Sequence, residues 1–101
     1  MIAILKLKVN FLGTGTSQGI PVIGSNHSVC LSKDAKDKRL RVSVWIHSED
    51  FSIVIDCGPD FRQQMLRENV QSIQGVFFTH EHADHTAGMD DLRPFCYQIG
   101  E

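Results

Sequence analysis

The stretch FFTHEHADHTAGMDD, residues 77–91, decides how the rest of the sequence is interpreted. Three of the chain's five histidines, His80, His82 and His85, fall within six residues of it, together with Asp84. A helical zinc-protease pattern, His-Glu-x-x-His, would need a histidine at position 84, so that pattern is excluded. In an extended turn His80 and His82 point the same way, because side chains repeat every two residues. The segment is therefore either a histidine-rich surface turn or, as we favour, a metal site.

The chemistry of these side chains favours the metal site. Neutral imidazole and carboxylate groups are ligands that zinc, manganese and iron accept. Asp84 and His85 follow at the bend into the next segment, close enough to serve a neighbouring ion. The spacing therefore predicts partial ligand sets for two adjacent divalent ions.

The segments around this turn predict alternating strands and helices. The short apolar run 76–78 predicts a strand before the turn, and TAGMDDLRPF predicts a short helix that stops before Pro94. Upstream, Pro59 suits a first helical turn, and Phe61, Met65 and Leu66 share one helical face. We expect Trp45, Phe77 and Phe78 in the core, with Cys57 and Cys96 as small buried side chains.

The first half of the chain predicts three more strands. VSVWI and FSIVI flank a polar turn at 47–50 and predict a β-hairpin. Near the N-terminus Leu5, Leu7, Val9 and Phe11 alternate with polar residues, which predicts a half-buried strand. A glycine-rich loop, GTGTSQGIPVIG, follows, and then KDAKDKRLR at 33–41, which we expect to be exposed. This order predicts helices packed on a mixed sheet.

Composition limits the classes of protein that fit. A chain of 101 residues makes at most one small domain, and a net charge of −2 does not favour nucleic acid or an acidic membrane as a partner. Three cysteines without repeated spacing fit reduced thiols better than a disulfide framework. The sequence contains no continuous apolar run long enough to span a bilayer. We therefore expect a cytoplasmic protein without a membrane partner.

THEHADH resembles the His-x-His-x-Asp-His signature of the metallo-β-lactamase superfamily. FLGTGTSQGIP resembles the opening loop of its phosphodiesterase branch. KDKRLRVSVWI, IVIDCGPDFRQQML and GMDDLRPF follow in the order expected of the phosphoribosyl cyclic phosphate phosphodiesterases. The resemblance implies an α/β (α+β) fold, the N-terminal half of an αββα sandwich with a mixed sheet and flanking helices. It also implies that residues 1–101 are a single partial domain with no second domain.

The resemblance implies a role for each residue of the turn. His80 and His82 would bind one metal, and Asp84 and His85 the second; the ions would be two zincs, with manganese or iron as alternatives. Asp84 would also be catalytic, because it would orient a hydroxide that bridges the metals. Asp56, in IDCG, would hold a ligand histidine in the right tautomer. Alternatively, Asp56 caps the turn before the Pro59 helix.

Further candidates have both a functional and a structural interpretation. The glycine-rich loop would bring backbone N–H groups to a substrate phosphate, or it only turns tightly. Arg39 and Arg41 would contact phosphates, or they belong to a solvated face, which we favour. His27 and Cys30 would hold a structural zinc with the help of a distant ligand. The predicted phosphate contacts are Gly13, Thr14, Gly15, Thr16, Ser17, Arg39 and Arg41.

The resemblance implies a metal-dependent hydrolase that cleaves a small cyclic phosphate or a related phosphodiester. The alternatives are an RNA-end-processing nuclease, a thioester hydrolase on the same fold, and a truncated metal-binding module without activity. The expected partner is a small phosphodiester substrate; nucleic acid is less favoured, and a homodimer is compatible with the sequence. We also expect the chain to lack downstream ligands, because no histidine follows His85.

Overall fold

The computed structural model describes residues 6–98 and contains a four-stranded sheet with the order β1-β2-β3-β4. The strands are β1 (Lys8–Gly13), β2 (Ser43–His47), β3 (Ser52–Ile55) and β4 (Gly75–Phe77). β1, β2 and β3 are antiparallel neighbours, whereas β4 pairs with β3 in parallel. The predicted hairpin and the predicted mixed sheet are therefore confirmed.

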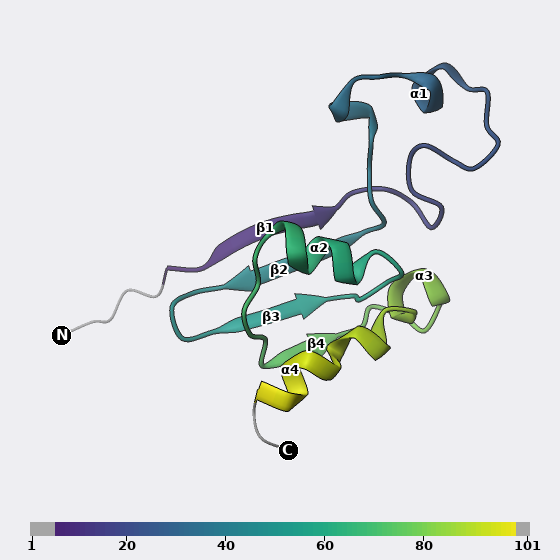
Figure 1. The fold of residues 1–101 in the computed structure, drawn as a ribbon. Helices are drawn as coiled ribbons and strands as arrows, with labels where there is room; N and C mark the ends of the chain where they lie inside the picture. The colour runs from purple at the N-terminus through teal and green to yellow at the C-terminus, as the bar shows by residue number, and fades with distance from the viewer. Residues whose placement is uncertain (1–5, 99–101) are drawn as a thin grey trace.

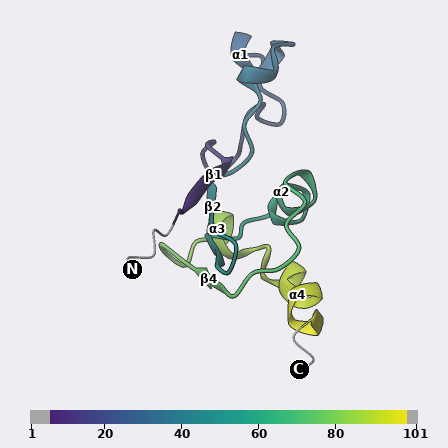
Figure 2. The same ribbon diagram turned by 90° about the vertical axis from the view of Figure 1, so that its left-hand side faces the viewer.

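Helices cover one face of this sheet. α2 (Phe61–Arg67) and α4 (Arg93–Gln98) lie on the same side, as the edge-on view in Figure 2 shows. Between them and the sheet lies a small core made of Leu12, Val54, Cys57, Phe61, Met65, Val70 and Ile73. α2 ends at Arg67 with Glu68 as its C-cap, and Asn69 follows with a positive φ of 54°, the left-handed conformation that often ends helices. α2 contributes Phe61 and Met65 to this core.

The opposite face of the sheet is apolar and has no helix over it among residues 6–98 (Figure 2). The strand registers place Val9, Ile46 and Ile53 in one row and Phe11, Val44, Ile55 and Phe77 in the next. We call these residues, with Leu7, the open face. The fractional exposures of Leu7, Val9, Phe11 and Phe77 are 50%, 55%, 69% and 61%.

The exposure of apolar side chains corrects two predictions. The first strand forms as expected but begins at Lys8, after Leu7 (Leu5 lies outside the described residues); its apolar side is the exposed one, and Leu12 is buried. Phe77 and Phe78 were expected in the core and are exposed, while Trp45 packs against the core as expected. Alternation identifies a strand, but it does not show which face another layer covers.

A long arm, residues 14–41, leaves the sheet between β1 and β2 and carries α1 (Ser28–Leu31) and η1 (Ala35–Asp37) (Figure 1). Isolated bridges join its two limbs, Gly15 to Arg41 and Ile20 to Arg39. At its base, Arg41 forms an ion pair with Asp60 at 3.0 Å, and its backbone N–H donates to the same carboxylate at 2.9 Å. These bonds tie the arm to the N-terminus of α2.

The helices correct three further predictions. The predicted helix before Pro94 is instead α3 (Ala83–Thr86) followed by η2 (Met89–Leu92), and Pro94 lies in the first turn of α4. Proline is tolerated there because the first helical N–H groups have no partner inside the helix. Cys96 is exposed rather than buried, and Leu66 is 63% exposed although it was placed on the packed face of its helix. Within residues 6–98, no helix has the length and apolarity to cross a membrane.

Candidate metal centre

The histidine turn, residues 80–85, lies where the two parallel strands end. β3 and β4 run in the same direction, so Asp56, just after β3, and Thr79, just after β4, meet at one edge of the sheet. Their backbones join there, because Asp56 N–H donates to the carbonyl of Phe77 at 2.8 Å. α3 then begins at Ala83, with His82 at its N-cap position. The turn is thus fixed to the sheet on one side and to a short helix on the other.

The predicted ligand side chains converge in this turn. One potential ligand atom from each of His80, His82 and Asp84 lies within 4.8 Å of the others, the only such group of three or more within residues 6–98. The ring centres of His80 and His82 are 4.6 Å apart, and those of His80 and His85 are 3.9 Å apart. His85 Nε2 lies 3.0 Å from an oxygen of Asp84. The structure therefore brings together all four residues that the spacing selected.

Asp56 is buried and faces the turn. Its φ is +64°, a left-handed conformation that is uncommon outside glycine and tolerated by aspartate. His85 Nδ1 donates to Asp56 Oδ2 at 2.7 Å, and Thr79 donates from its backbone N–H and from its hydroxyl, each at 2.8 Å. The side chain therefore bonds to the histidine turn and makes no bond to α2.

The ionisation state of Asp56 follows from these bonds. Burial acts to raise the pKa of the Asp56 carboxyl, but the hydrogen bonds from His85 and then from Thr79 outweigh it, so the pKa is lowered overall. A carboxylate that accepts several hydrogen bonds stays charged. Because His85 donates through Nδ1, its Nε2 is the nitrogen that remains for a metal.

Two glycines that the sequence analysis did not select allow the loop after β3 to pack against the turn. A Cβ on Gly58 would collide with the Asp84 carbonyl oxygen, and a Cβ on Gly88 would collide with the Gly58 carbonyl and lie 2.7 Å from Phe61 Cβ. Backbone bonds cross the same contact, from Cys57 N–H to the His85 carbonyl and from Gly88 N–H to the Cys57 carbonyl, both 2.9 Å. Glycine is required here by close backbone approach, a signal that one sequence does not reveal.

The donor set fits a divalent ion. Zinc accepts imidazole nitrogen and carboxylate oxygen at about 2.0–2.2 Å in tetrahedral geometry, so two ligands of one ion lie about 3.3–3.6 Å apart. The His80, His82 and Asp84 ligand atoms lie within 4.8 Å of one another, so these side chains are near one another and would move closer to hold an ion. Asp56 accepts a hydrogen bond from His85 Nδ1 and so fixes the ring, an arrangement that is common for histidines that bind metals.

The predicted phosphate contacts take part in bonds that hold the arm. A Cβ on Gly15 would lie 2.8 Å from the Leu40 carbonyl oxygen, so this glycine permits close backbone packing. Arg39 donates to Thr14 Oγ1 at 2.7 Å, and Arg41 Nε donates to the Ser17 carbonyl at 2.8 Å. Tight packing thus accounts for this part of the loop, and contact with a phosphate stays a prediction for these residues.

The predicted structural zinc site shows a different local geometry. His27 Nδ1 accepts a hydrogen bond from the Val29 N–H at 3.2 Å, which caps α1. The pKa of the Cys30 thiol is lowered, first by a hydrogen bond from the Val22 backbone and then by one from Ser25. Among the described residues His27 and Cys30 belong to no group of three potential ligands. A zinc ion at this position stays a prediction.

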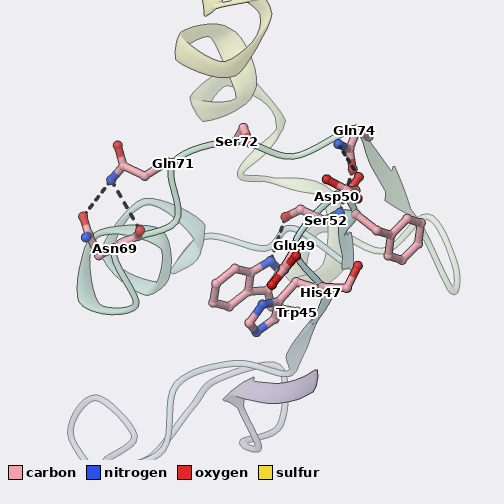
Figure 3. A pocket seen from close by; sticks show the side chains of 11 residues that line it. Trp45, His47, Glu49, Asp50, Ser52, Asn69, Gln71, Ser72 and Gln74 are labelled. Atoms are coloured by element: carbon pink, nitrogen blue, oxygen red, sulfur yellow. Dashed lines mark hydrogen bonds between the residues drawn. The ribbon is translucent and has the colours of Figure 1, made fainter. Parts of the chain in front are cut away.

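The sheet also has a hollow of about 500 Å³ at its opposite end, beside the β2–β3 turn (Figure 3). Trp45 and His47 stack there with ring centres 3.5 Å apart, and the indole N–H donates to Ser52 Oγ at 2.8 Å. Burial, followed by the charge of Lys8, lowers the pKa of His47. Gln71 and Gln74 bond to neighbouring wall groups, Asn69, Ser52 and Asp50 (Figure 3). This hollow is remote from the histidine turn and shares no lining residue with it.

Comparison with known sequences places the histidine turn in a family. A model of the beta-lactamase superfamily domain matches residues 52–100. An octanoyltransferase of Porphyromonas gingivalis is 49% identical over 87 residues, which cover 85% of this chain and 18% of that protein. A ribonuclease Z of Prochlorococcus marinus is 32% identical over 88 residues, which cover 85% of this chain and 24% of that protein. The chain thus spans no more than a quarter of these relatives.

Comparison with solved structures agrees. A diphosphatase of the PhnP family matches with a TM-score of 0.86 and 46% identity, over 89% of this chain and 36% of that chain. The Zn²⁺-bound PqqB of Methylobacterium extorquens matches with a TM-score of 0.70 and 25% identity, over 84% of this chain and 33% of that chain. The relatives therefore include hydrolases and a zinc-bound protein. The chain is thus similar to the beta-lactamase superfamily domain in sequence over residues 52–100, and its α+β fold matches that of metallo-β-lactamase-fold proteins.

Proposed function

We propose that this protein is a metal-dependent hydrolase that cleaves a phosphodiester, most simply a small cyclic phosphate, with two divalent ions at the histidine turn. The observation that carries the proposal is the convergence of His80, His82, Asp84 and His85 in front of the buried Asp56. Divalent ions supply a nucleophile at neutral pH and stabilise the negative charge that develops on phosphoryl oxygens.

The chain's own residues divide the work of holding such ions. His80 and His82 would bind one ion and Asp84 and His85 the other, with zinc the best match to these donors. The Asp56 carboxylate fixes the orientation of His85. Asp84 Oδ2, 3.0 Å from His85 Nε2, would also orient the attacking group and accept its proton.

Phosphorus chemistry is favoured over acyl chemistry by the relatives. The diphosphatase and the ribonuclease Z proteins both cleave bonds to phosphorus, and the diphosphatase matches 89% of this chain. The octanoyltransferase, whose name indicates acyl transfer, shares 18% of its length with this chain. The ribonuclease Z relatives support an RNA-end-processing nuclease as the second candidate.

The open face supports the proposal that these residues form one half of a larger sandwich. A catalytic zinc usually has three protein ligands, and this turn offers two for each of two ions. The open face begins beside the turn, at Phe77, and is apolar along its whole length. We propose that a second apolar sheet packs on it and brings the remaining ligands to the same edge.

The test measures bound zinc and hydrolysis of bis(4-nitrophenyl) phosphate by the chain and by two histidine variants. His82→Ala should lose zinc and reduce any hydrolysis at least about 100-fold, while His47→Ala, at the far end of the sheet, should keep both. Zinc binding without hydrolysis would favour the alternative of a metal-binding module. No difference in zinc content between the two variants would contradict the proposal.

A further inference from the structure

A threonine that the predicted ligand set does not include contacts two of its histidines. Thr79 Oγ1 lies 2.8 Å from Asp56 Oδ2, 3.1 Å from His80 Nδ1 and 3.3 Å from His85 Nδ1. Thr79 is also held in place by its backbone, whose N–H donates to Asp56 Oδ1 at 2.8 Å. The Thr79 hydroxyl is therefore held between the Asp56 carboxylate and the rings of His80 and His85.

The direction of these hydrogen bonds follows from the chemistry of the partners. A hydroxyl has one proton to donate, and an ionised carboxylate can only accept. The Thr79 proton therefore goes to Asp56, and the oxygen lone pairs of Thr79 face His80 Nδ1. A favourable contact at 3.1 Å then requires a proton on His80 Nδ1, since an unprotonated nitrogen would place two lone pairs against each other.

We infer that Thr79 is a positioning residue that links the Asp56 carboxylate to His80 through hydrogen bonds and thereby orients the His80 ring. Asp56 holds a proton on His85 Nδ1 directly and on His80 Nδ1 through Thr79, so Nε2 is the nitrogen of each ring that is left for a metal. His80 and His85 are predicted ligands of different ions, so one buried carboxylate orients ligands of both. The metal part of this inference rests on the proposed function, whereas the tautomer part concerns the metal-free protein.

The test compares three threonine variants in the full 101-residue chain. Thr79→Val removes the hydroxyl and keeps the shape, and Thr79→Ser restores the hydroxyl. Thr86→Val is the matched control, because Thr86 ends α3 and, within residues 6–98, its hydroxyl bonds only to the His82 carbonyl, at 3.2 Å. Circular dichroism and thermal unfolding establish that each variant is folded.

The first measurement is the tautomer of each histidine ring in the zinc-free protein, from ¹⁵N chemical shifts. We expect His80 to carry its proton on Nδ1 in the wild type, in Thr79→Ser and in Thr86→Val, and to become a mixture of tautomers in Thr79→Val. His85 should keep its proton on Nδ1 in all four proteins, because Asp56 contacts it directly. An unchanged His80 tautomer in Thr79→Val would overturn the inference, whether or not the protein hydrolyses anything.

The second measurement is zinc affinity, from competition with a chelator. Loss of a group that orients a ligand typically weakens metal binding about 10–100-fold, so we expect Thr79→Val to raise the zinc Kd at least about tenfold and Thr79→Ser to restore it. Equal affinity in Thr79→Val and Thr86→Val would overturn the positioning role. If the wild type binds no zinc, the proposed function fails, but the tautomer measurement still shows whether Thr79 sets the tautomer of His80.

Discussion

Replacement of Gly58 by alanine tests whether the loop after β3 sets the position of the histidine turn. The added Cβ would collide with the carbonyl oxygen of Asp84 and lie 3.0 Å from its carbonyl carbon. Both neighbours are backbone atoms, which cannot rotate away as a side chain can. The Asp84 peptide must therefore move by on the order of 1 Å, and overpacking of this kind costs about 1–3 kcal/mol of stability.

The substitution should weaken the metal site as well as the fold. Residues that orient ligands typically alter metal affinity about 10–100-fold, which corresponds to about 1.4–2.8 kcal/mol of binding free energy. We expect Gly58→Ala to weaken zinc binding within this range, because Asp84 and His85 move with the displaced peptide. Chelator competition measures the affinity, and urea denaturation measures the free energy of unfolding.

Gly75→Ala is the matched control for this experiment. A Cβ on Gly75 would meet its nearest atoms at 3.8 Å, in Phe77, and 4.0 Å, in Ile53, which are ordinary contacts. This variant should keep the zinc affinity of the wild type. Unchanged zinc affinity in Gly58→Ala, or an equal loss in Gly75→Ala, would refute the reasoning.

Three other predictions concern the thiols, the arm and the open face. Burial, followed by the charges of Asp91 and Asp56, raises the pKa of Cys57 to about 11. At pH 8 iodoacetamide should therefore modify the exposed Cys96 and spare Cys57, and mass spectrometry of the peptides measures the labelling. Equal labelling of the two thiols would contradict this prediction. Asp60→Ala should lower the free energy of unfolding by about 1–3 kcal/mol in urea titration, because the ion pair and the backbone hydrogen bond from Arg41 lose their partner. A change below about 0.5 kcal/mol would show that these bonds do not hold the arm in place. The exposed apolar side chains of the open face should make the chain self-associate. Phe11→Glu should shift the chain toward monomer in sedimentation velocity. A wild-type chain that stays monomeric at high concentration would contradict this expectation.

The raised pKa of Cys57 also predicts the sign of a pH effect. A thiol that keeps its proton more tightly when folded contributes stability below the unfolded pKa of 9.0. That contribution is lost as the pH rises from 9.0 toward about 11. Wild type should therefore lose more stability across this range than Cys57→Ala does, and equal losses would count against the burial of the thiol.

Much of the sheet could be predicted from local pattern. β-branched runs separated by a polar turn gave the hairpin, and the apolar run 76–78 gave the strand before the histidine turn, because these signals depend only on neighbouring residues. Burial was predicted less well, since it depends on the layers above each face. Val9 and Phe11 alternate as a buried strand would, yet they lie on the open face.

The candidate site likewise contains residues that the sequence predicted and residues that it did not. His80, His82, Asp84 and His85 are close in sequence, so their spacing alone suggested that they converge. Asp56 was found only through the family resemblance, because a strand and a helix separate it from the turn. Thr79, Gly58 and Gly88 were missed, since a hydroxyl behind a ligand and a close backbone contact leave no pattern in one sequence.

The central claim, that the histidine turn binds divalent metal through nitrogen and oxygen, is tested most directly by X-ray absorption at the zinc edge of the zinc-loaded chain. The predicted spectrum has a first shell of nitrogen and oxygen alone, at about 2.0–2.2 Å, with the multiple scattering that imidazole rings produce. A sulfur shell at about 2.3 Å would place the zinc at a cysteine instead, and failure to retain zinc would contradict the claim outright.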